Sequence, residues 1–197
     1  LGVLETPIAL TNTFSVGAVA EAQIRQAVTA NPQVGRELPT VNPLVFECND
    51  GYLNDIQALA VAPAHYDAAY QAAATRFAQG SVGAGRGMSC FSLKGGIGTA
   101  SRLAQVQPGV RYTVGALVLA NFGRLPNLIV AGRPFGRRLA DRLDRAGGAG
   151  QGRAPGEPEK GSIILLLATD APLDARQLRR LSLRAGAGLA RTGSVFG

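Results

Sequence analysis

The residues of this 197-residue chain that are best placed for chemistry are Gly161 and Ser162. Residues 146–161 contain six glycines and two prolines with no apolar period, which predicts a linker. The unbroken apolar run 163–168 follows at once and is typical of a strand that is covered on both faces. A linker that delivers Gly-Ser to a buried strand meets the needs of a self-cleaving enzyme whose nucleophile becomes a new N-terminus.

Such cleavage would begin with attack of the Ser162 hydroxyl on the carbonyl of Gly161. Glycine has no Cβ and therefore tolerates the strained backbone that this attack requires. An N-to-O acyl shift and hydrolysis would leave Ser162 with a free α-amine, whose unperturbed pKa of about 7.7–8.0 lets it act as base for its own hydroxyl. The same dipeptide recurs at residues 80–81 and 193–194, so spacing alone leaves an ordinary linker as the alternative.

The other reactive side chains favour structural roles. His65 is the single histidine, and its place before an Ala-rich stretch predicts a surface position near the start of a helix. Cys48 and Cys90 form no CxxC pattern, so we expect neither a disulfide framework nor a zinc site and interpret both as buried small hydrophobes in a reduced cytoplasm. Glycine-rich residues 83–87 and 94–96 match neither a dinucleotide fingerprint nor a P-loop. We expect no metal and no organic cofactor.

The net charge of +7, from 18 Arg and 2 Lys against 13 acidic residues, raises the question of a polyanion partner. The arginines are spread along the chain, and the densest group, at positions 176, 179, 180 and 184, has the spacing of one solvated helix face. Aromatic residues interleaved for base stacking are missing. No apolar run approaches the roughly 18 residues of a membrane span. We predict a soluble protein that binds neither nucleic acid nor membrane.

Hydrophobic periodicity predicts a mixed, layered α/β architecture that positions these residues. Strands are expected at 44–48, within 88–103, at 110–120, at 128–131 and from Ser162 onward. Helices are expected at 17–30, 66–78, 137–146 and 173–190, the last with Pro172 in its first turn and Leu178, Leu181 and Ala185 on its inner face. We find no internal repeat and expect one domain over residues 1–197.

Five segments follow one another along nearly the whole chain: residues 7–17, 47–55, 94–102, 112–123 and 161–173. They include the runs Thr-Asn-Thr-Phe-Ser-Val-Gly, Glu-Cys-Asn-Asp-Gly-Tyr-Leu-Asn-Asp and Lys-Gly-Gly-Ile-Gly-Thr-Ala-Ser-Arg. Together the segments resemble the L-aminopeptidase/D-Ala-esterase/amidase family of the DmpA type. This family includes the β-peptidyl aminopeptidases and is related to the nylon-oligomer hydrolases. Each segment alone is a weak signal, whereas the ordered set is specific.

The resemblance implies an αββα sandwich of the DmpA and ornithine-acetyltransferase-like type, and a precursor that cuts itself between Gly161 and Ser162. Residues 1–161 would belong to the α chain, and residues 162–197 would begin the β chain. Ser162 would be the nucleophile and Asn121 the donor to the oxyanion of the tetrahedral intermediate. Glu47 would bind the free α- or β-amine of the substrate.

Further correspondences concern the surroundings of the nucleophile. Lys94 resembles a lysine that the nylon hydrolases use near theirs, with a solvated lysine in a glycine loop as the alternative. Relatives carry a tyrosine in the segment around Glu47, and Asn49 or Tyr52 is expected to replace it. The family's second serine and acidic residue would come after Gly197, so the chain resembles the middle of a longer protein. Leu1 opens no visible signal peptide, and we predict a cytoplasmic location with the periplasm as the alternative.

We therefore predict a self-processing serine aminopeptidase or amidase. It would release N-terminal residues, D- and β-residues included, from small peptides, amino-acid amides or esters. The resemblance also implies a homo-oligomer, by default a tetramer of αβ units. Two alternatives stay open. An ornithine-acetyltransferase-like acyl transferase has a similar architecture but normally exposes Thr where this chain has Ser162, and a noncatalytic basic protein would bind nucleic acid with salt-sensitive affinity.

Overall fold

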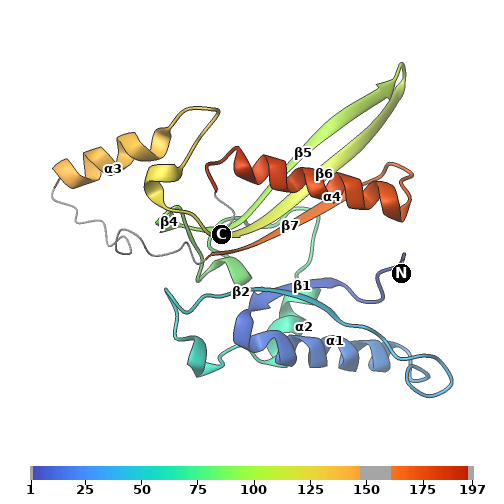
Figure 1. The fold of residues 1–197 in the computed structure, drawn as a ribbon. Coiled ribbons are helices and arrows are strands. Elements are labelled where there is room, and N and C mark those ends of the chain that lie inside the picture. The colour runs from blue at the N-terminus through green and yellow to red at the C-terminus, as the bar shows by residue number, and fades with distance from the viewer. Residues whose placement is uncertain (1, 147–160, 195–197) are drawn as a thin grey trace.

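The computed structural model describes residues 2–146 and 161–194. Within these residues the elements stack in layers in the order helix, sheet, sheet, helix (Figure 1). The layers are helices α1 (Val16–Ala30) and α2 (Pro63–Gln71), the pair β1 (Ile8–Asn12) and β2 (Leu44–Cys48), the sheet of β5 (Gly96–Gln107), β6 (Val110–Asn121) and β7 (Ser162–Thr169), and helix α4 (Ala175–Ala190). The predicted αββα sandwich is confirmed.

Strands β1 and β2 pair in parallel, in a register that sets Asn12 opposite Cys48. The chain passes from one to the other through a short 3₁₀ turn, η1 (Thr13–Ser15), and helix α1, because parallel neighbours need a crossover connection. Val19 and Ala22 of α1 are buried together with Tyr66 of α2, and Ala9 and Val45 of the strands pack against them. One face of the β1–β2 pair is therefore covered by helices α1 and α2.

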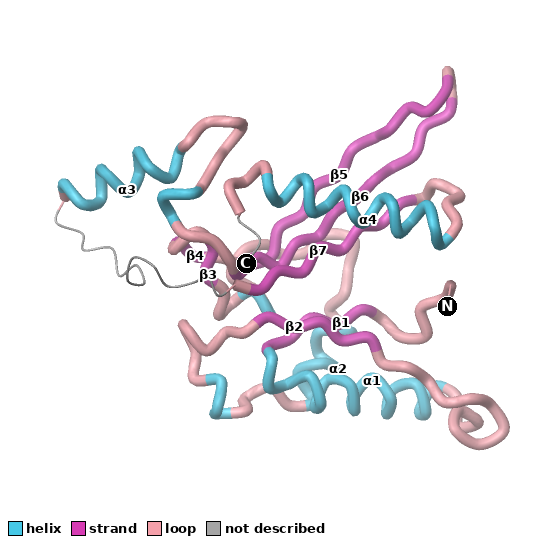
Figure 2. Tube along the Cα trace, viewed as in Figure 1, coloured by secondary structure: helices cyan, strands magenta, loops and turns pink. Residues whose placement is uncertain are grey.

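The sheet β5–β6–β7 is antiparallel throughout, and Asn121 at the end of β6 lies opposite Ser162 at the start of β7. Figure 2 shows the β1–β2 pair between helices α1 and α2 on one side and β7 on the other. The side chains that fill the space between the two sheets form a second buried cluster of Cys48, Met88, Leu119 and Ile164. The C-terminal end of β2 therefore lies at the edge where β6 ends and β7 begins.

The smaller elements connect these layers. They are η2 (Ile56–Ala58), η3 (Gly83–Gly85), the short hairpin β3 (Ser89–Cys90) and β4 (Leu93–Lys94), η4 (Leu125–Asn127) and helix α3 (Phe135–Arg145). Phe91 and Ser92 take the left-handed conformation that the tight β3–β4 turn requires, with φ of 52° and 59°. The predicted strand within 88–103 therefore divides into this hairpin and the long strand β5.

Two of the expected elements differ from the structure. The predicted strand at 128–131 is wrong: the chain forms η4 and then turns at Ala131 and Gly132, both with positive φ, so that Val130 and Arg133 share an isolated bridge. The helix predicted at 66–78 runs from Pro63 to Gln71, because proline suits the first helical turn. Tyr66 is the buried residue of this helix. The Ala-rich segment after Gln71 does not continue the helix, because helical propensity alone does not stabilise a helix without tertiary packing.

The last strand and helix also differ in detail. Strand β7 is less covered than its apolar run predicts, since Ile164 is buried while its neighbours are partly exposed. Helix α4 begins at Ala175, after Pro172, because the carboxylate of Asp174 accepts a hydrogen bond from the backbone N–H of Gln177 in a capping box. The predicted inner-face residue Leu178 is 43% exposed. The predicted linker 146–161 lies outside the described residues except at its two ends.

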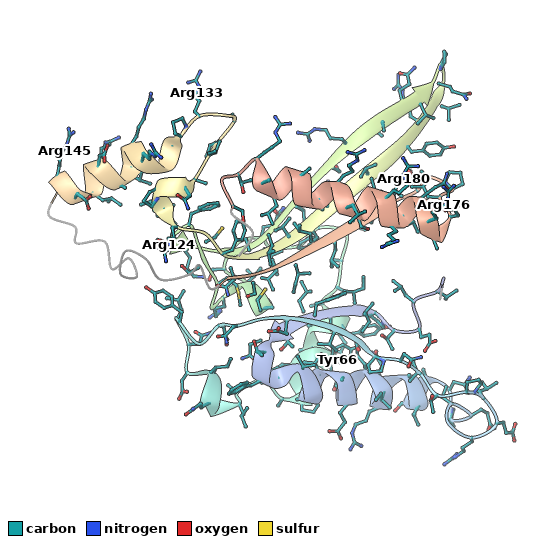
Figure 3. All side chains as sticks on the ribbon, viewed as in Figure 1. Tyr66, Arg124, Arg133, Arg145, Arg176 and Arg180 are labelled. Carbon is teal, nitrogen blue, oxygen red and sulfur yellow. The ribbon has the colours of Figure 1, made fainter. Side chains whose placement is uncertain are left out.

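The position of the histidine and the distribution of the arginines on the surface agree with the predictions made for them. His65 is exposed in the first turn of α2, where its Nδ1 accepts a hydrogen bond from the backbone N–H of Ala62. The labelled arginines of Figure 3 lie on separate parts of the molecule, at or beside α3 and on α4. In the described residues, no helix combines the length and the apolar character that crossing a membrane requires.

Candidate active site

Ser162 occupies the first position of β7, directly after Gly161. A Cβ on Gly161 would lie 2.8 Å from Cβ and 3.0 Å from Cα of Phe122, so the packed backbone leaves no room for a side chain there. Position 161 therefore requires glycine because the chain before β7 passes close to the chain after β6. This contact holds the predicted scissile junction against the end of the sheet.

The side chain of Asn121 joins three segments of the chain. Its Oδ1 accepts a hydrogen bond of 3.0 Å from the backbone N–H of Ser89, and its Nδ2 donates to the backbone carbonyl of Asn49 at 2.7 Å and to Ser162 Oγ at 3.0 Å. A backbone N–H can only donate, so the bond from Ser89 fixes which end of the amide is oxygen. The amide N–H is consequently directed at the hydroxyl oxygen of Ser162.

Cys48, the last residue of β2, packs against Leu119 near the end of β6 and Ile164 near the start of β7. Its side chain is fully buried, and its Sγ lies 4.0 Å from the carbonyl oxygen of Leu119. Burial raises the pKa of the Cys48 thiol, and the nearby Glu47 carboxylate acts in the same direction. The interpretation of Cys48 as a buried small side chain is confirmed.

Glu47 precedes Cys48, so the two side chains leave opposite faces of β2. The Thr13 hydroxyl, at the start of η1, donates a hydrogen bond to Glu47 Oε2. Its charge is thus placed near the carboxyl end of β2, where Thr13 holds it.

The two replacements expected for the family tyrosine are placed differently. Asn49 reaches the site through its backbone carbonyl, which accepts from Asn121, while its side-chain oxygen accepts a bond of 2.9 Å from the backbone N–H of Gly51. Tyr52 is 67% exposed on the following turn. The hydrogen bond to the Ser162 side chain comes instead from Asn121.

Lys94 stabilises the backbone of the loop next to the site. Its ammonium donates to the carbonyl oxygens of Gly85, Met88 and Gly95 at 3.3, 3.0 and 3.4 Å. The residue lies opposite Ser89 in the β3–β4 hairpin, and Ser89 in turn donates its backbone N–H to Asn121. Lys94 therefore stabilises the loop whose backbone N–H, at Ser89, orients the Asn121 amide.

Asp50 is a site-supporting residue that sequence reasoning missed. It is 7% exposed, and its Oδ2 accepts from the side-chain amides of Asn12 at 3.2 Å and Asn54 at 2.9 Å. A Cβ on Gly87 would lie 2.4 Å from Asn54 Nδ2, so the loop before β3 packs closely on this turn. The polar cluster holds the turn that presents the Asn49 carbonyl, and the only sequence signal for it was the density of Asn and Asp around residue 50.

A cavity of about 830 Å³ opens on the other side of Asp50, between β1, α2 and η3. Ile8, Leu10, Tyr66 and Tyr70 contribute to its wall, and Ser162 does not. In residues 2–146 and 161–194, no group of three or more His, Cys, Asp or Glu side chains converges as metal ligands would. The polar group that meets the Ser162 hydroxyl is the Asn121 amide, a donor of the kind that stabilises an oxyanion in acyl transfer.

The sequence matches the model of peptidase family S58 over residues 1–197. The chain belongs to peptidase family S58. It is 44% identical over 98% of its length to the β-peptidyl aminopeptidase BapA of Sphingosinicella microcystinivorans, of which the match covers 49%. The expected relationship to the L-aminopeptidase/D-Ala-esterase/amidase family is thereby confirmed.

Solved structures show the same fold. A β-aminopeptidase of Burkholderia sp. superposes with a TM-score of 0.81 at 44% identity, covering 97% of this chain and 49% of that one. The L-aminopeptidase D-Ala-esterase/amidase of Ochrobactrum anthropi superposes with a TM-score of 0.80 at 36% identity, over 95% of this chain and 49% of that one, and is described as a variant of the Ntn-hydrolase fold. The chain spans about half the length of these relatives.

Proposed function

We propose that the complete protein is a self-processing serine aminopeptidase or amidase with Ser162 as its nucleophile. The observation that carries this proposal is the orientation of Asn121, whose amide is fixed by Ser89 so that Nδ2 lies 3.0 Å from Ser162 Oγ. Membership of peptidase family S58 supports the reaction class. The position of Ser162 directly after a glycine that has no space for a side chain supports the site of cleavage.

In the proposed maturation step, Ser162 Oγ attacks the carbonyl carbon of Gly161 and the acyl group moves from nitrogen to oxygen. Water then hydrolyses the ester, which leaves a carboxylate on Gly161 and a free amine on Ser162. That amine takes the proton from the adjacent hydroxyl when a substrate carbonyl is attacked. The amine or alcohol of the substrate departs, and water releases the acyl group.

Asn121 is proposed to stabilise the negative oxygen of the tetrahedral intermediate. Its Nδ2 is held by two acceptors in the described structure, the Asn49 carbonyl and Ser162 Oγ. The first of these fixes the amide in place, so that a donor is already oriented where charge develops. Lys94 and Asp50 are proposed to act on the same group indirectly, through Ser89 and Asn49.

Glu47 is proposed to bind the free amine of the substrate, which would make N-terminally blocked substrates poor ones. Its location at the end of β2, one residue from Cys48, supports this role. Small peptides, amino-acid amides and esters are the proposed substrates. Because a 44% identical relative is named a β-peptidyl aminopeptidase, β-amino acid N-termini are included among them. A role for Tyr52, a tetramer of αβ units and a cytoplasmic location stay predictions.

The test is an intact-mass measurement on the complete protein and on its Ser162→Ala variant. The wild type is expected to yield two fragments, one of which begins Ser-Ile-Ile-Leu, and to hydrolyse members of a panel of amino-acid p-nitroanilides that includes β-alanine. The Ser162→Ala variant is expected to stay whole and inactive. Ser81→Ala is a matched control, because Ser81 also follows a glycine and is exposed.

Equal cleavage and turnover by wild type and Ser162→Ala would refute the assigned nucleophile. Acyl transfer from acetyl-ornithine without hydrolysis of the panel would favour the acyl transferase instead. Salt-sensitive binding of DNA by an uncleaved protein would favour the noncatalytic alternative.

A further inference from the structure

Phe91 and Phe122 form an aromatic pair beside the predicted scissile junction that the proposed mechanism does not use. Phe91 is 5% exposed and lies in the turn between β3 and β4, and Phe122 follows directly after Asn121 at the end of β6. Their ring centroids lie 5.1 Å apart in an edge-to-face arrangement, with 68° between the ring planes. The backbone N–H of Phe91 also donates a hydrogen bond of 2.7 Å to the carbonyl oxygen of Phe122. Two contacts thus join the hairpin turn to the chain after β6.

Local preference does not explain the aromatic residue at position 91. The β3–β4 hairpin has a two-residue turn, Phe91 and Ser92, with positive φ at both positions. Such turns favour Asn-Gly, because bulky side chains rarely adopt positive φ. A residue in this conformation persists only where the surrounding structure determines it. The surroundings of Phe91 are Phe122 and the chain after it, since a Cβ on Gly123 would lie 2.6 Å from Cδ1 of the Phe91 ring.

Phe122 in turn packs against Gly161. A Cβ at position 161 would lie 2.8 Å from Cβ of Phe122 and 3.2 Å from the backbone carbonyl oxygen of Asn121. Gly161 carries the carbonyl that Ser162 attacks in the proposed maturation step. A continuous set of contacts therefore runs from the buried Phe91 ring through Phe122 to the residue whose carbonyl must be held within reach of the hydroxyl.

We propose that Phe91 and Phe122 are positioning residues for self-cleavage, which hold Gly161 where Ser162 Oγ can attack its carbonyl carbon. The proposal rests on the proposed function, since it concerns the maturation step of that reaction. Attack requires the two reacting atoms to be close and aligned, and a displacement of about 1 Å can slow such a step about 10²-fold. An edge-to-face ring pair suits this task because it combines a large buried apolar surface with a specific geometry.

The β3–β4 hairpin holds two neighbouring residues of the site by separate contacts. The backbone N–H of Ser89 orients the Asn121 amide at 3.0 Å, and the Phe91 ring packs on Phe122. Asn121 is proposed to act in every turnover, whereas the Gly161 carbonyl reacts once, during maturation. Loss of the aromatic contact is therefore expected to slow self-cleavage more than it slows turnover by the cleaved enzyme.

The experiment follows self-cleavage of the complete protein during cell-free synthesis. Phe91→Asn removes one ring and places in the turn a residue that tolerates positive φ, and Phe122→Ala removes the other ring but keeps the Cβ that packs against Gly161. Phe122→Tyr keeps the ring and is the conservative variant. Val19→Ala is the matched packing control, because Val19 is buried in the separate cluster of α1 and α2. The measurements are the initial rate of cleavage by intact mass, kcat on a p-nitroanilide after cleavage is complete, and Tm.

Phe91→Asn and Phe122→Ala are each expected to slow self-cleavage about tenfold and to keep kcat within about threefold of wild type. Phe122→Tyr is expected to cleave within about threefold of the wild-type rate. Val19→Ala is expected to lower Tm while cleaving at the wild-type rate, because it weakens packing away from the junction. A purely structural role of the rings would likewise lower Tm without slowing cleavage.

Wild-type cleavage rates in Phe91→Asn and Phe122→Ala would overturn the proposal, and so would an equal slowing of cleavage in Val19→Ala. Equal losses of kcat and cleavage rate in the two ring variants would also overturn it, because the rings would then act on Asn121 and not on Gly161. If either ring variant does not fold, Phe122→Leu takes its place and is judged by the same criteria.

Ser162→Ala is measured in parallel so that the two proposals can fail separately. A Ser162→Ala variant that stays whole, beside ring variants that cleave at the wild-type rate, would refute only the role of the aromatic pair. A wild-type protein that stays whole, or a Ser162→Ala variant that is cleaved, would refute the proposed function as well.

Discussion

The two ends of the β5–β6–β7 sheet share strands β5 and β6, whereas β7 pairs with β6 only from Val114 to Asn121, and the two ends differ in how their side chains are held. At the end where β6 meets β7, Asn121 is bonded to three segments and Leu119 is fully buried. At the far end, where the β5–β6 hairpin extends away from the body of the molecule, Leu103 is 69% and Val106 60% exposed (Figure 1).

The difference teaches that regular strand geometry is not enough to make a site. Both ends have ladder pairing, interrupted near the hairpin tip by a register shift between Gln105 and Gln107, and β6 alternates side chains along its length. Only one end lies against a second sheet, where Cys48 of β2 packs on Leu119 and Ile164. Packing between the sheets therefore restricts the side chains around Ser162, while Leu103 and Val106 near the hairpin tip are exposed.

The largest expected effect is on catalysis at the packed end. In the complete protein, Asn121→Ala is expected to lower kcat by about 10²- to 10³-fold, the cost of removing an oxyanion donor. Val110→Ala, at the opposite end of the same strand, is the matched control and is expected to keep wild-type kcat. The check is p-nitroanilide turnover by proteins with equal Tm. A loss of less than about threefold in Asn121→Ala would contradict the assigned role.

A smaller effect is expected on stability. Leu119→Ala removes a fully buried side chain between the sheets and is expected to lower the free energy of unfolding by about 2–5 kcal/mol. Leu103→Ala makes the same chemical change at the exposed hairpin tip and is expected to alter it by no more than about 0.5 kcal/mol. Denaturant unfolding of both variants provides the measurement. Similar losses in the two would show that the complete protein covers the hairpin tip.

The smallest expected effect is on the stability of the folded protein at alkaline pH. Burial raises the pKa of the Cys48 thiol in the folded protein, whereas the unfolded thiol titrates near pH 8.5. The stabilisation from this neutral thiol is fully present below about pH 8.5 and is lost as pH rises toward the folded pKa. Stability should thus fall with alkaline pH, and Cys48→Ala should flatten that part of the curve. Leu103→Ala should retain the wild-type slope, and an unchanged slope in Cys48→Ala would disprove the assignment.

Tyr66 contributes at higher pH and provides a second internal control. Its hydroxyl donates to Gln26 Oε1 at 2.8 Å, and burial raises the pKa of the tyrosine. By the same linkage, its contribution is present below about pH 10 and lost above it. Tyr66→Phe should therefore change the slope of the stability curve only in its most alkaline part, besides the pH-independent loss of the hydrogen bond to Gln26.

Local signals predicted much of the fold. The strand 44–48 coincides with β2, the alternation from Val110 predicted β6 up to Asn121, and the apolar run after Ser162 predicted β7. These succeed because each pattern reflects burial of one face along a continuous segment. The strand at 128–131 failed because two positive-φ residues turn the chain at 131–132, which apolar composition does not reveal.

The features of the candidate site likewise divide into those that the sequence predicted and those that it did not. The Gly161-Ser162 junction was visible in the sequence because linker, dipeptide and strand are contiguous. The surroundings of Cys48 and Asp50 were not, because each depends on residues far along the chain: Cys48 packs on Leu119 and Ile164, and Asp50 accepts a hydrogen bond from Asn12. Neither contact leaves a periodic trace.

By itself, the order of residue types determined the family-like segments, the apolar faces of the main strands and the glycine before the serine. Tertiary structure decided which groups surround that serine and which way the Asn121 amide points. The physical reason is that hydrogen-bond direction and strand register are set by partners 32 to 72 positions away, through Ser89 and Asn49. Such partners come together only when the two sheets pack.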